Sequence, residues 1–317
     1  MTIQRIKFDR LVSDDDLKTL AGQYLGDEWI HHEIDYDCDI YDSETNAFIC
    51  SFRKKRVSSD LTNLALDTLA PLAVASRGRG HASGPIDPES KYWRKRTLVN
   101  TKGTRTGYLK SDGTPSKMSV NNQVGSIALG FFDKTKALGV DLPCRLTYHT
   151  AAALNQYETG LSYIDELNRW YKKIHPDKHK IQLERANTHS KYKIRKTAYS
   201  TITVNRTFRT ALHKDRGDFG GIATLSVLEH GRYRGGLFMM PAYGIGINMR
   251  EGDVLVADVH QFHCNSEIWT TPEDDQYNDS LPERFKIDKN VGTLGLDKKY
   301  SRISFVCYLR SNLVDCV

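Results

Sequence analysis

Seven short β-rich segments follow one another from Thr197 onward, and they constrain the fold more than any other feature of the chain. Gly and polar turns separate them, and only the last two lie far apart. They occupy 197–204, 208–213, 222–230, 236–241, 245–249, 253–259 and 302–309. Closely spaced strands without intervening helices favour a sandwich or barrel over β–α–β units. We expect an α+β protein with a jelly-roll core, a double-stranded β-helix, over about 197–310.

Helical elements are expected around this core. Four leucines between positions 61 and 69 lie near one face of a helix, and 161–174 has the spacing of an amphipathic helix. We therefore expect a helical N-terminal region over 1–76 that packs on the core, with 77–317 as the main domain. The polar stretch 270–298 interrupts the last pair of strands, and it is expected to be either a lid or a surface insertion.

Basic residues gather in two stretches of the chain. Residues 77–117 hold 10 bases and 3 acids, and 169–196 hold 10 bases and 2 acids, although the formal net charge is only +6. This distribution suits a polyanion such as nucleic acid, and the alternative is a solvated basic face. Arg94, Lys95 and Arg96 in the first stretch are candidate DNA-binding residues.

Cysteine usage and apolar runs point to an intracellular protein. The six cysteines lie far apart with no C-x-x-C pair, so we expect reduced thiols. No apolar run approaches the roughly 18 residues that span a bilayer, and the N-terminal residues lack the apolar stretch of a signal peptide. We expect a soluble monomer without membrane contact, nuclear in a eukaryote and cytoplasmic otherwise.

A candidate metal site lies among the strands. His213 and Asp215 are two residues apart at the end of a strand-like run, so both side chains face one side and can bind one ion. His260 and His263 follow a later strand, and either could place an imidazole next to His213 and Asp215. Two histidines and one carboxylate form the facial triad of non-haem Fe(II) enzymes. An H-x-D pair alone is also common as surface polarity.

The last strand carries a candidate co-substrate site. Arg302 and Ser304 face the same side of that strand. An arginine can hold a carboxylate through two hydrogen bonds and a serine can add a hydroxyl donor, which suits the distal carboxylate of 2-oxoglutarate. Asn205 and Arg209 precede the H-x-D pair and could reach the other carboxylate of the co-substrate.

The stretch NRTFRTALHKDRGDFGGIATLSVLEHGRYRGGLFMMPAYGIGINMREGDVLVADVHQFHCN, followed by SRISF, resembles the 2-oxoglutarate and Fe(II)-dependent dioxygenases, in particular the TET and J-binding-protein branch. The likeness is strongest over 197–265 and 302–304. Enzymes of this branch oxidise the methyl group of 5-methylpyrimidines in DNA. The resemblance implies Fe(II) as the metal and 2-oxoglutarate as the co-substrate, held by Arg302 and Ser304.

The same resemblance assigns the iron ligands. His213 and Asp215 match the H-x-D pair, and the family places the distal histidine five residues after an Asp that ends a strand. Asp258 then points to His263 as the third ligand. His260 is either a substrate-facing residue or a buried, hydrogen-bonded histidine.

Asp218 lies where the DNA-oxidising relatives place a polar residue against the target base. An ionised carboxylate accepts from the exocyclic amine of cytosine and repels O4 of thymine, which favours 5-methylcytosine. The alternative is that Asp218 only caps the turn around Gly220.

We therefore predict a dioxygenase that acts on double-stranded DNA and oxidises the methyl group of flipped 5-methylcytosine to 5-hydroxymethylcytosine, or further. Three alternatives remain open. The enzyme could hydroxylate thymine in DNA, or it could be a hydroxylase of the same fold that acts on a protein or a small molecule. The chain could also be a DNA-binding module with an inactive barrel.

Overall fold

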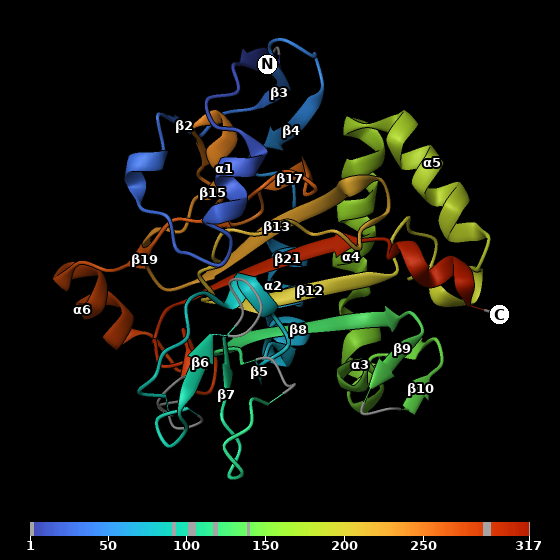
Figure 1. Cartoon of the computed structure of the whole chain (residues 1–317). Coiled ribbons are helices and arrows are strands. Elements are labelled where there is room, and N and C mark those ends of the chain that lie inside the picture. Colours follow the sequence, from blue (N-terminus) through green and yellow to red (C-terminus); the bar gives the residue numbers. More distant parts are fainter. Residues whose placement is uncertain are drawn as a thin grey trace.

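Two β-sheets form the centre of the protein in a computed structural model, which describes residues 3–90, 93–100, 106–116, 120–137, 140–287 and 293–316 (Figure 1). The large sheet contains, in order of pairing, β1 (Gln4–Phe8), β3 (Cys38–Asp42), β4 (Phe48–Arg53), β17 (Val254–Asp258), β13 (Ile222–His230), β21 (Ser301–Tyr308), β12 (Thr201–Arg206), β8 (Gln123–Phe132) and β11 (Arg145–Leu146). β5 (Ala75–Ser76) and β20 (Thr293–Leu294) also pair with β8. The small sheet contains β18 (Cys264–Asn265), β15 (Phe238–Met240), β16 (Ile245–Ile247) and β2 (His32–Ile34).

Side-chain alternation gives the large sheet two different faces. The strands from β17 to β8 pair antiparallel. On β12, Thr203 and Asn205 line a cavity, whereas Ile202 and Val204 belong to a buried hydrophobic cluster shared with the helices. This period of two is that of a strand buried on both sides. One face therefore positions polar groups, and the other packs the core.

Helices cover the second face of the large sheet. α2 (Ser59–Thr68) and α4 (Leu154–Ile174) contribute buried side chains to the cluster around Ile202, and α5 (Pro176–Asn187) follows α4 directly (Figure 1). α4 buries residues three or four positions apart, which is the helical period that the sequence predicts. Pro176 ends α4 and begins α5, because proline cannot supply the hydrogen bond that a helix interior needs. No helix in the described ranges combines the length and apolarity needed to cross a membrane.

Smaller elements complete the described part of the chain. They are α1 (Asp14–Thr19), β6 (Leu98–Asn100), β7 (Thr106–Tyr108), β9 (Thr135–Ala137), β10 (Val140–Leu142), α3 (Tyr148–Ala152), β14 (Arg234–Gly235), β19 (Ile268–Trp269) and α6 (Pro272–Ser280), besides short 3-10 turns.

The N-terminal region is less helical than the sequence predicts. Besides α1 and α2 it supplies strands to both sheets, since β4 pairs antiparallel with β17 and β2 pairs parallel with β16. The acidic residues around β3 obscure the alternation of buried Cys38 and Ile40 in the sequence. Residues 3–76 thus pack directly on both sheets, and the division of the chain into 1–76 and 77–317 stays a prediction.

The segment 270–298 is attached to a turn of the protein. Asn278 accepts a hydrogen bond from the backbone N–H of Arg232 at 2.7 Å and donates one to its carbonyl oxygen at 2.9 Å, and Asp274 pairs with Arg234 at 2.9 Å. None of the described residues of this segment lines the main cavity. The described residues of this segment therefore lie outside the cavity lining, and the choice between a lid and a surface insertion stays a prediction.

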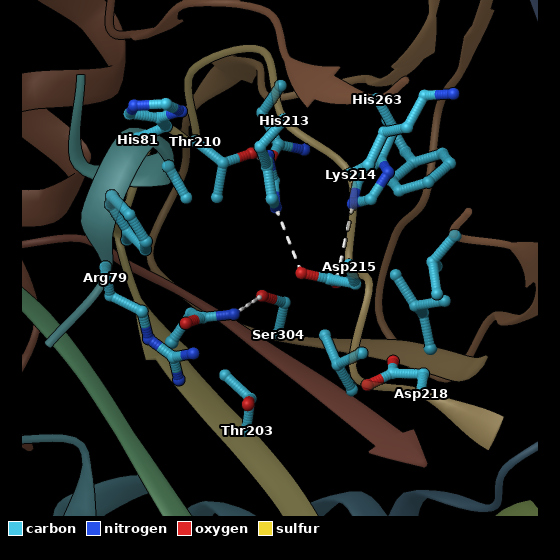
Figure 2. A pocket seen from close by; sticks show the side chains of 18 of the residues that line it. Arg79, His81, Thr203, Thr210, His213, Lys214, Asp215, Asp218, His263 and Ser304 are labelled. Atoms are coloured by element: carbon cyan, nitrogen blue, oxygen red, sulfur yellow. Dashed lines mark hydrogen bonds and ion pairs between the residues drawn. The ribbon is translucent and has the colours of Figure 1, made fainter. Parts of the chain in front are cut away.

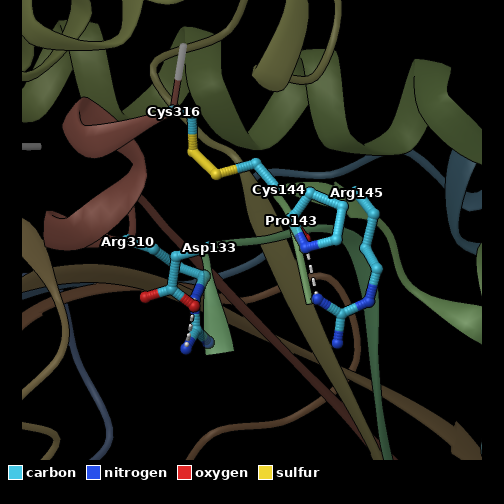
Figure 3. Close-up of a disulfide and its surroundings, with 6 residues drawn as sticks. All are labelled: Asp133, Pro143, Cys144, Arg145, Arg310 and Cys316. Carbon is cyan, nitrogen blue, oxygen red and sulfur yellow. Dashed lines mark hydrogen bonds and ion pairs between the residues drawn. A yellow bond between two sulfur atoms is a disulfide. The ribbon is translucent and has the colours of Figure 1, made fainter. Parts of the chain in front are cut away.

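Two cysteines contradict the expectation of reduced thiols. Cys144, next to β11, and Cys316, near the C-terminal end, form a disulfide with a Cα–Cα distance of 5.7 Å (Figure 3). They are 172 residues apart, so only the folded chain brings them together. Cys38, Cys50 and Cys264 are free and buried, as is Cys307.

Candidate active site

A cavity of about 820 Å³ lies between the two sheets and contains the predicted metal-binding residues (Figure 2). β12 and β21 of the large sheet line it with Asn205, Arg302 and Ser304, and the small sheet contributes Phe238 and Asn265. Polar groups from distant parts of the sequence therefore converge on one cavity, as at most small-molecule sites.

His213, Asp215 and His263 form a cluster in this cavity, and their candidate ligand atoms lie within 4.8 Å of one another. Backbone hydrogen bonds set their positions. His213 and His263 bond to each other in both directions at 3.0 Å, and the N–H of Asp215 donates to Val259 at 3.0 Å. The segment after β17 thus holds the H-x-D pair in place.

The side-chain geometry leaves one nitrogen of each histidine facing the carboxylate. Nε2 of His213 lies 3.7 Å from Oδ1 of Asp215, and Nε2 of His263 lies 3.6 Å from Oδ2 (Figure 2). Nδ1 of His213 donates to the carbonyl of Ala211 at 2.8 Å, and Nδ1 of His263 donates to Gln261 at 3.0 Å. These bonds fix the tautomer in which Nε2 carries the free lone pair.

The charge states suit metal binding. Burial, and then the neighbouring His263, lowers the pKa of His213 to about 4. Burial alone would raise the pKa of Asp215, but the two imidazoles beside it, those of His263 and His213, outweigh burial, so its pKa is lowered. Neutral imidazole and ionised carboxylate are the forms that bind a divalent cation.

Arg302 provides a test of whether the cavity fits 2-oxoglutarate. Its side chain is buried, with 4% exposed, and its Nε has no hydrogen-bond partner. Ser304 lies on the same face of β21, and its Oγ accepts a 3.1 Å hydrogen bond from Asn205. A buried guanidinium with an unsatisfied donor is costly unless an anion binds it. A carboxylate of the co-substrate meets that need, so these residues fit it.

Asp218 lines the cavity, but its environment differs from the prediction (Figure 2). It is buried, its Oδ2 has no hydrogen-bond partner, and it makes no side-chain cap to the turn that follows. Burial, and then the charge of Asp215, raises its pKa well above the usual range. This environment disfavours the ionised form of Asp218 on which the preference for 5-methylcytosine depends.

Arg209 does not lie in the cavity, which corrects the prediction that it reaches the co-substrate. Its guanidinium donates to the carbonyl of Leu25 at 2.8 Å and lies over the ring of Tyr24. β12 ends at Arg206, and Thr207 has a φ of 44°, so strand alternation does not continue to Arg209.

His260 is also outside the cavity lining. Its Nε2 donates to the carbonyl oxygen of Asp218 at 3.1 Å, so it holds the backbone of Asp218 from outside the cavity. Of the two alternatives, the structure favours the hydrogen-bonded histidine, although the residue is exposed and not buried.

The predicted DNA-binding residues lie away from the cavity lining. Arg94, Lys95 and Arg96 are exposed in the turn before β6, and the guanidinium of Arg96 lies 4.4 Å from the centre of the Tyr108 ring. Exposure leaves these cations accessible to a polyanion.

Arg79 is a cavity residue that the sequence analysis missed (Figure 2). Its Nε donates to Ser126, whose hydroxyl in turn donates to Oδ1 of Asn205 at 2.5 Å. Burial lowers the pKa of Arg79. The only signal was its place in the glycine-rich stretch SRGRGHASG, which the sequence analysis counted as part of a basic region.

The fold and the site together define an Fe(II) and 2-oxoglutarate-dependent oxygenase. A sequence model of the TET/JBP family, described as the oxygenase domain of the 2OGFeDO superfamily, matches residues 128–311. The chain belongs to this family, as the sequence analysis predicted, and the family uses Fe(II) and 2-oxoglutarate.

The chain is also similar to individual proteins. Thymine dioxygenase JBP1 of Trypanosoma brucei brucei is 38% identical over 140 residues, which cover 44% of this chain and 16% of that protein. Thymine dioxygenase JBP1-B of Trypanosoma cruzi (strain CL Brener) is 31% identical over 186 residues, or 58% and 19% of the two chains. The chain thus spans less than a fifth of these relatives.

Among solved structures, NgTET1 in complex with 5mC DNA matches with a TM-score of 0.48 and 10% identity over 95% of this chain and 92% of that one.

Proposed function

We propose that this chain oxidises the 5-methyl group of a pyrimidine base in double-stranded DNA. The observation that carries the proposal is the convergence of His213, Asp215 and His263 with Arg302 in one cavity. His213, Asp215 and His263 would hold Fe(II) as a facial triad. Bound Fe(II) and 2-oxoglutarate supply the chemistry that couples decarboxylation of the co-substrate to insertion of oxygen into a C–H bond.

The protein's own part is to position the reactants and keep water out. Arg302 binds one carboxylate of the co-substrate, and Ser304 with Asn205 orients it from the adjoining positions. The hydrogen bonds at Nδ1 of His213 and His263 hold the imidazoles in a fixed orientation. We also propose that the two sheets are the halves of a double-stranded β-helix.

The substrate base must leave the duplex to react. A cavity of about 820 Å³ has room for the co-substrate and one flipped base, whereas a methyl group inside a duplex groove cannot reach a buried metal. Arg94, Lys95 and Arg96 would bind phosphates outside the cavity.

Two bases are candidates for the target. The sequence favours 5-methylcytosine if Asp218 is ionised. Thymine has better support, because the curated relatives are named thymine dioxygenases and because a neutral Asp218 can donate a hydrogen bond to O4. Oxidation beyond the hydroxymethyl stage stays a prediction.

The test is mass spectrometry of nucleosides after incubation with Fe(II), 2-oxoglutarate and two duplexes, one with thymine and one also containing 5-methylcytosine. We expect a hydroxymethylated base that disappears in the Asp215→Ala variant. If 2-oxoglutarate is consumed but neither base is oxidised in any duplex, the substrate is a protein or a small molecule. DNA binding without consumption of 2-oxoglutarate would point to an inactive DNA-binding module.

A further inference from the structure

A second cavity, of about 630 Å³, lies outside the site described above. Its cations are Arg206, Arg284 and Lys286, and apolar side chains make up the rest of its wall. Arg206 follows Asn205 on β12, so the two side chains point to opposite faces of the sheet. The main cavity and this one therefore lie on either side of the same strand.

Arg206 is a buried cation that forms no ion pair with any residue of the described ranges. Only 6% of the residue is exposed. Its Nε donates to Oγ of Ser301 at 3.2 Å and its Nη1 donates to the carbonyl of Lys286 at 2.9 Å, which leaves Nη2 uncommitted. Among the residues that the structure describes, no carboxylate lies within ion-pairing distance of it. Burial lowers the pKa of Arg206, and the charge of Glu283 offsets this only in part.

Two other buried or half-buried arginines of the chain, in contrast to Arg206, do form ion pairs. Arg53 pairs with Asp39 at 2.6 Å, and Arg310 pairs with Asp133 at 3.0 Å. Arg302 forms no ion pair with a carboxylate of the described residues, and its position fits the carboxylate of a co-substrate. A buried charge is retained at a cost unless a partner compensates it, so Arg206 calls for an anion in the same way.

We propose that the cavity at Arg206 binds a small organic anion, a carboxylate or a phosphate. The guanidinium of Arg206 would hold the anionic group together with the ammonium of Lys286. Val74, Ile287 and other apolar side chains would contact the rest of the ligand. The anionic group could belong to a free metabolite or to a phosphate of the DNA backbone.

The site is connected to the co-substrate site through the backbone. Arg206 bonds to the side chain of Ser301, which precedes Arg302. Thr207 donates from its N–H to the carbonyl of Arg302 at 2.7 Å and accepts at Oγ1 from the N–H of Arg302 at 3.3 Å. These bonds place the proposed anion site next to the strand end that carries Arg302.

The proposal is tested on protein loaded with redox-inactive Mn(II) and saturating 2-oxoglutarate, so that Arg302 is occupied. Sodium phosphate and sodium butyrate are titrated at constant ionic strength, and the melting temperature is recorded. We expect the melting temperature of the wild type to rise saturably with either phosphate or butyrate. Val74→Trp should fill the cavity and abolish the rise, and Arg206→Met should weaken the affinity at least about tenfold, the equivalent of one lost charged partner.

Val140→Trp is the matched control, because Val140 is an exposed valine outside both cavities. It should leave the rise unchanged. No saturable rise in the wild type, or an equal rise in the Val74→Trp and Arg206→Met variants, overturns the proposal. Val74→Trp keeps the test valid if Arg206→Met does not fold.

A second arm separates the two sources of the anion. The affinity for an unmethylated duplex is measured against salt concentration. If a backbone phosphate occupies the site, Arg206→Met should reduce the logarithmic salt slope by about 0.9, the value for one phosphate contact. An unchanged slope identifies a free anion. Because these measurements follow binding and not turnover, they are independent of whether the chain oxidises DNA.

Discussion

His213 and His263 exchange two backbone hydrogen bonds of 3.0 Å each, so the first and last members of the metal-binding cluster are fixed to each other before any ion binds. Their rings lie 4.3 Å apart, and Asp215 lies across from both Nε2 atoms. This pairing places His263 in the cluster, whereas the ring of His260 donates to the carbonyl of Asp218.

Removal of any one of the three clustered side chains should abolish metal binding. We expect His213→Ala, Asp215→Ala and His263→Ala each to lose turnover and most of the iron affinity, because two ligands cannot hold a facial site. Iron content and initial rate are the measurements. His260→Ala is the matched control and should keep its iron. An intact His263→Ala enzyme together with an iron-free His260→Ala enzyme would refute this assignment.

Arg302→Ala should affect the co-substrate more than the DNA. Loss of a buried, charge-assisted pair is expected to raise the KM for 2-oxoglutarate on the order of 100-fold. Arg209→Ala removes an arginine outside the cavity and should leave that KM within about twofold, as is usual for contacts away from a site. Equal loss of DNA affinity and an unchanged KM would place Arg302 on the DNA-binding surface.

Simultaneous replacement of Arg94, Lys95 and Arg96 by Gln should weaken the binding of all duplexes alike. Each phosphate contact adds about 0.9 to the logarithmic salt slope, so the slope should fall by up to about 3. Iron content should be unchanged, since the three residues are outside the cavity. A slope equal to that of the wild type would show that this turn is only a solvated basic surface.

Much of the candidate site could be predicted from the sequence because its residues come in pairs that lie close together along the chain. The interval of two between His213 and Asp215, and between Arg302 and Ser304, is the period of an extended chain, and the structure preserves it. The prediction that Arg209 reaches the co-substrate was wrong because β12 ends at Arg206. Thr207 then adopts a positive φ, which sequence spacing does not reveal.

Long-range features were not predictable in this way. Arg79 reaches the cavity from a loop far from β12 in the sequence, and the pairing of Cys144 with Cys316 depends on the folded chain. The raised pKa of Asp218 also depends on burial beside Asp215, which no local pattern encodes.

Thiol counting tests the disulfide. We expect four reactive thiols in the unfolded, unreduced protein and six after reduction, since Cys144 and Cys316 are bonded and the other cysteines are free. Cys144→Ala should lower the free energy of unfolding by about 2–4 kcal/mol under non-reducing conditions, because the unfolded chain is no longer constrained. The same variant should match the wild type when both are reduced. Six thiols without reductant would contradict the pairing.

Asp218 should decide between the two target bases, and its substitutions separate charge from hydrogen bonding. A neutral acid can donate to O4 of thymine, and so can the amide of Asn, so Asp218→Asn should keep the preference of the wild type for thymine. Asp218→Ala lacks the donor and should lose about 1 kcal/mol on thymine, about fivefold in kcat/KM, the low end of the range for a base contact.

The measurement is the ratio of kcat/KM on thymine and 5-methylcytosine duplexes at matched iron content. The opposite result is a wild type that prefers 5-methylcytosine, with a weaker preference in Asp218→Asn. That result would show that Asp218 is ionised during the reaction and that 5-methylcytosine is the target. A ratio that none of the substitutions changes would show that other residues read the base.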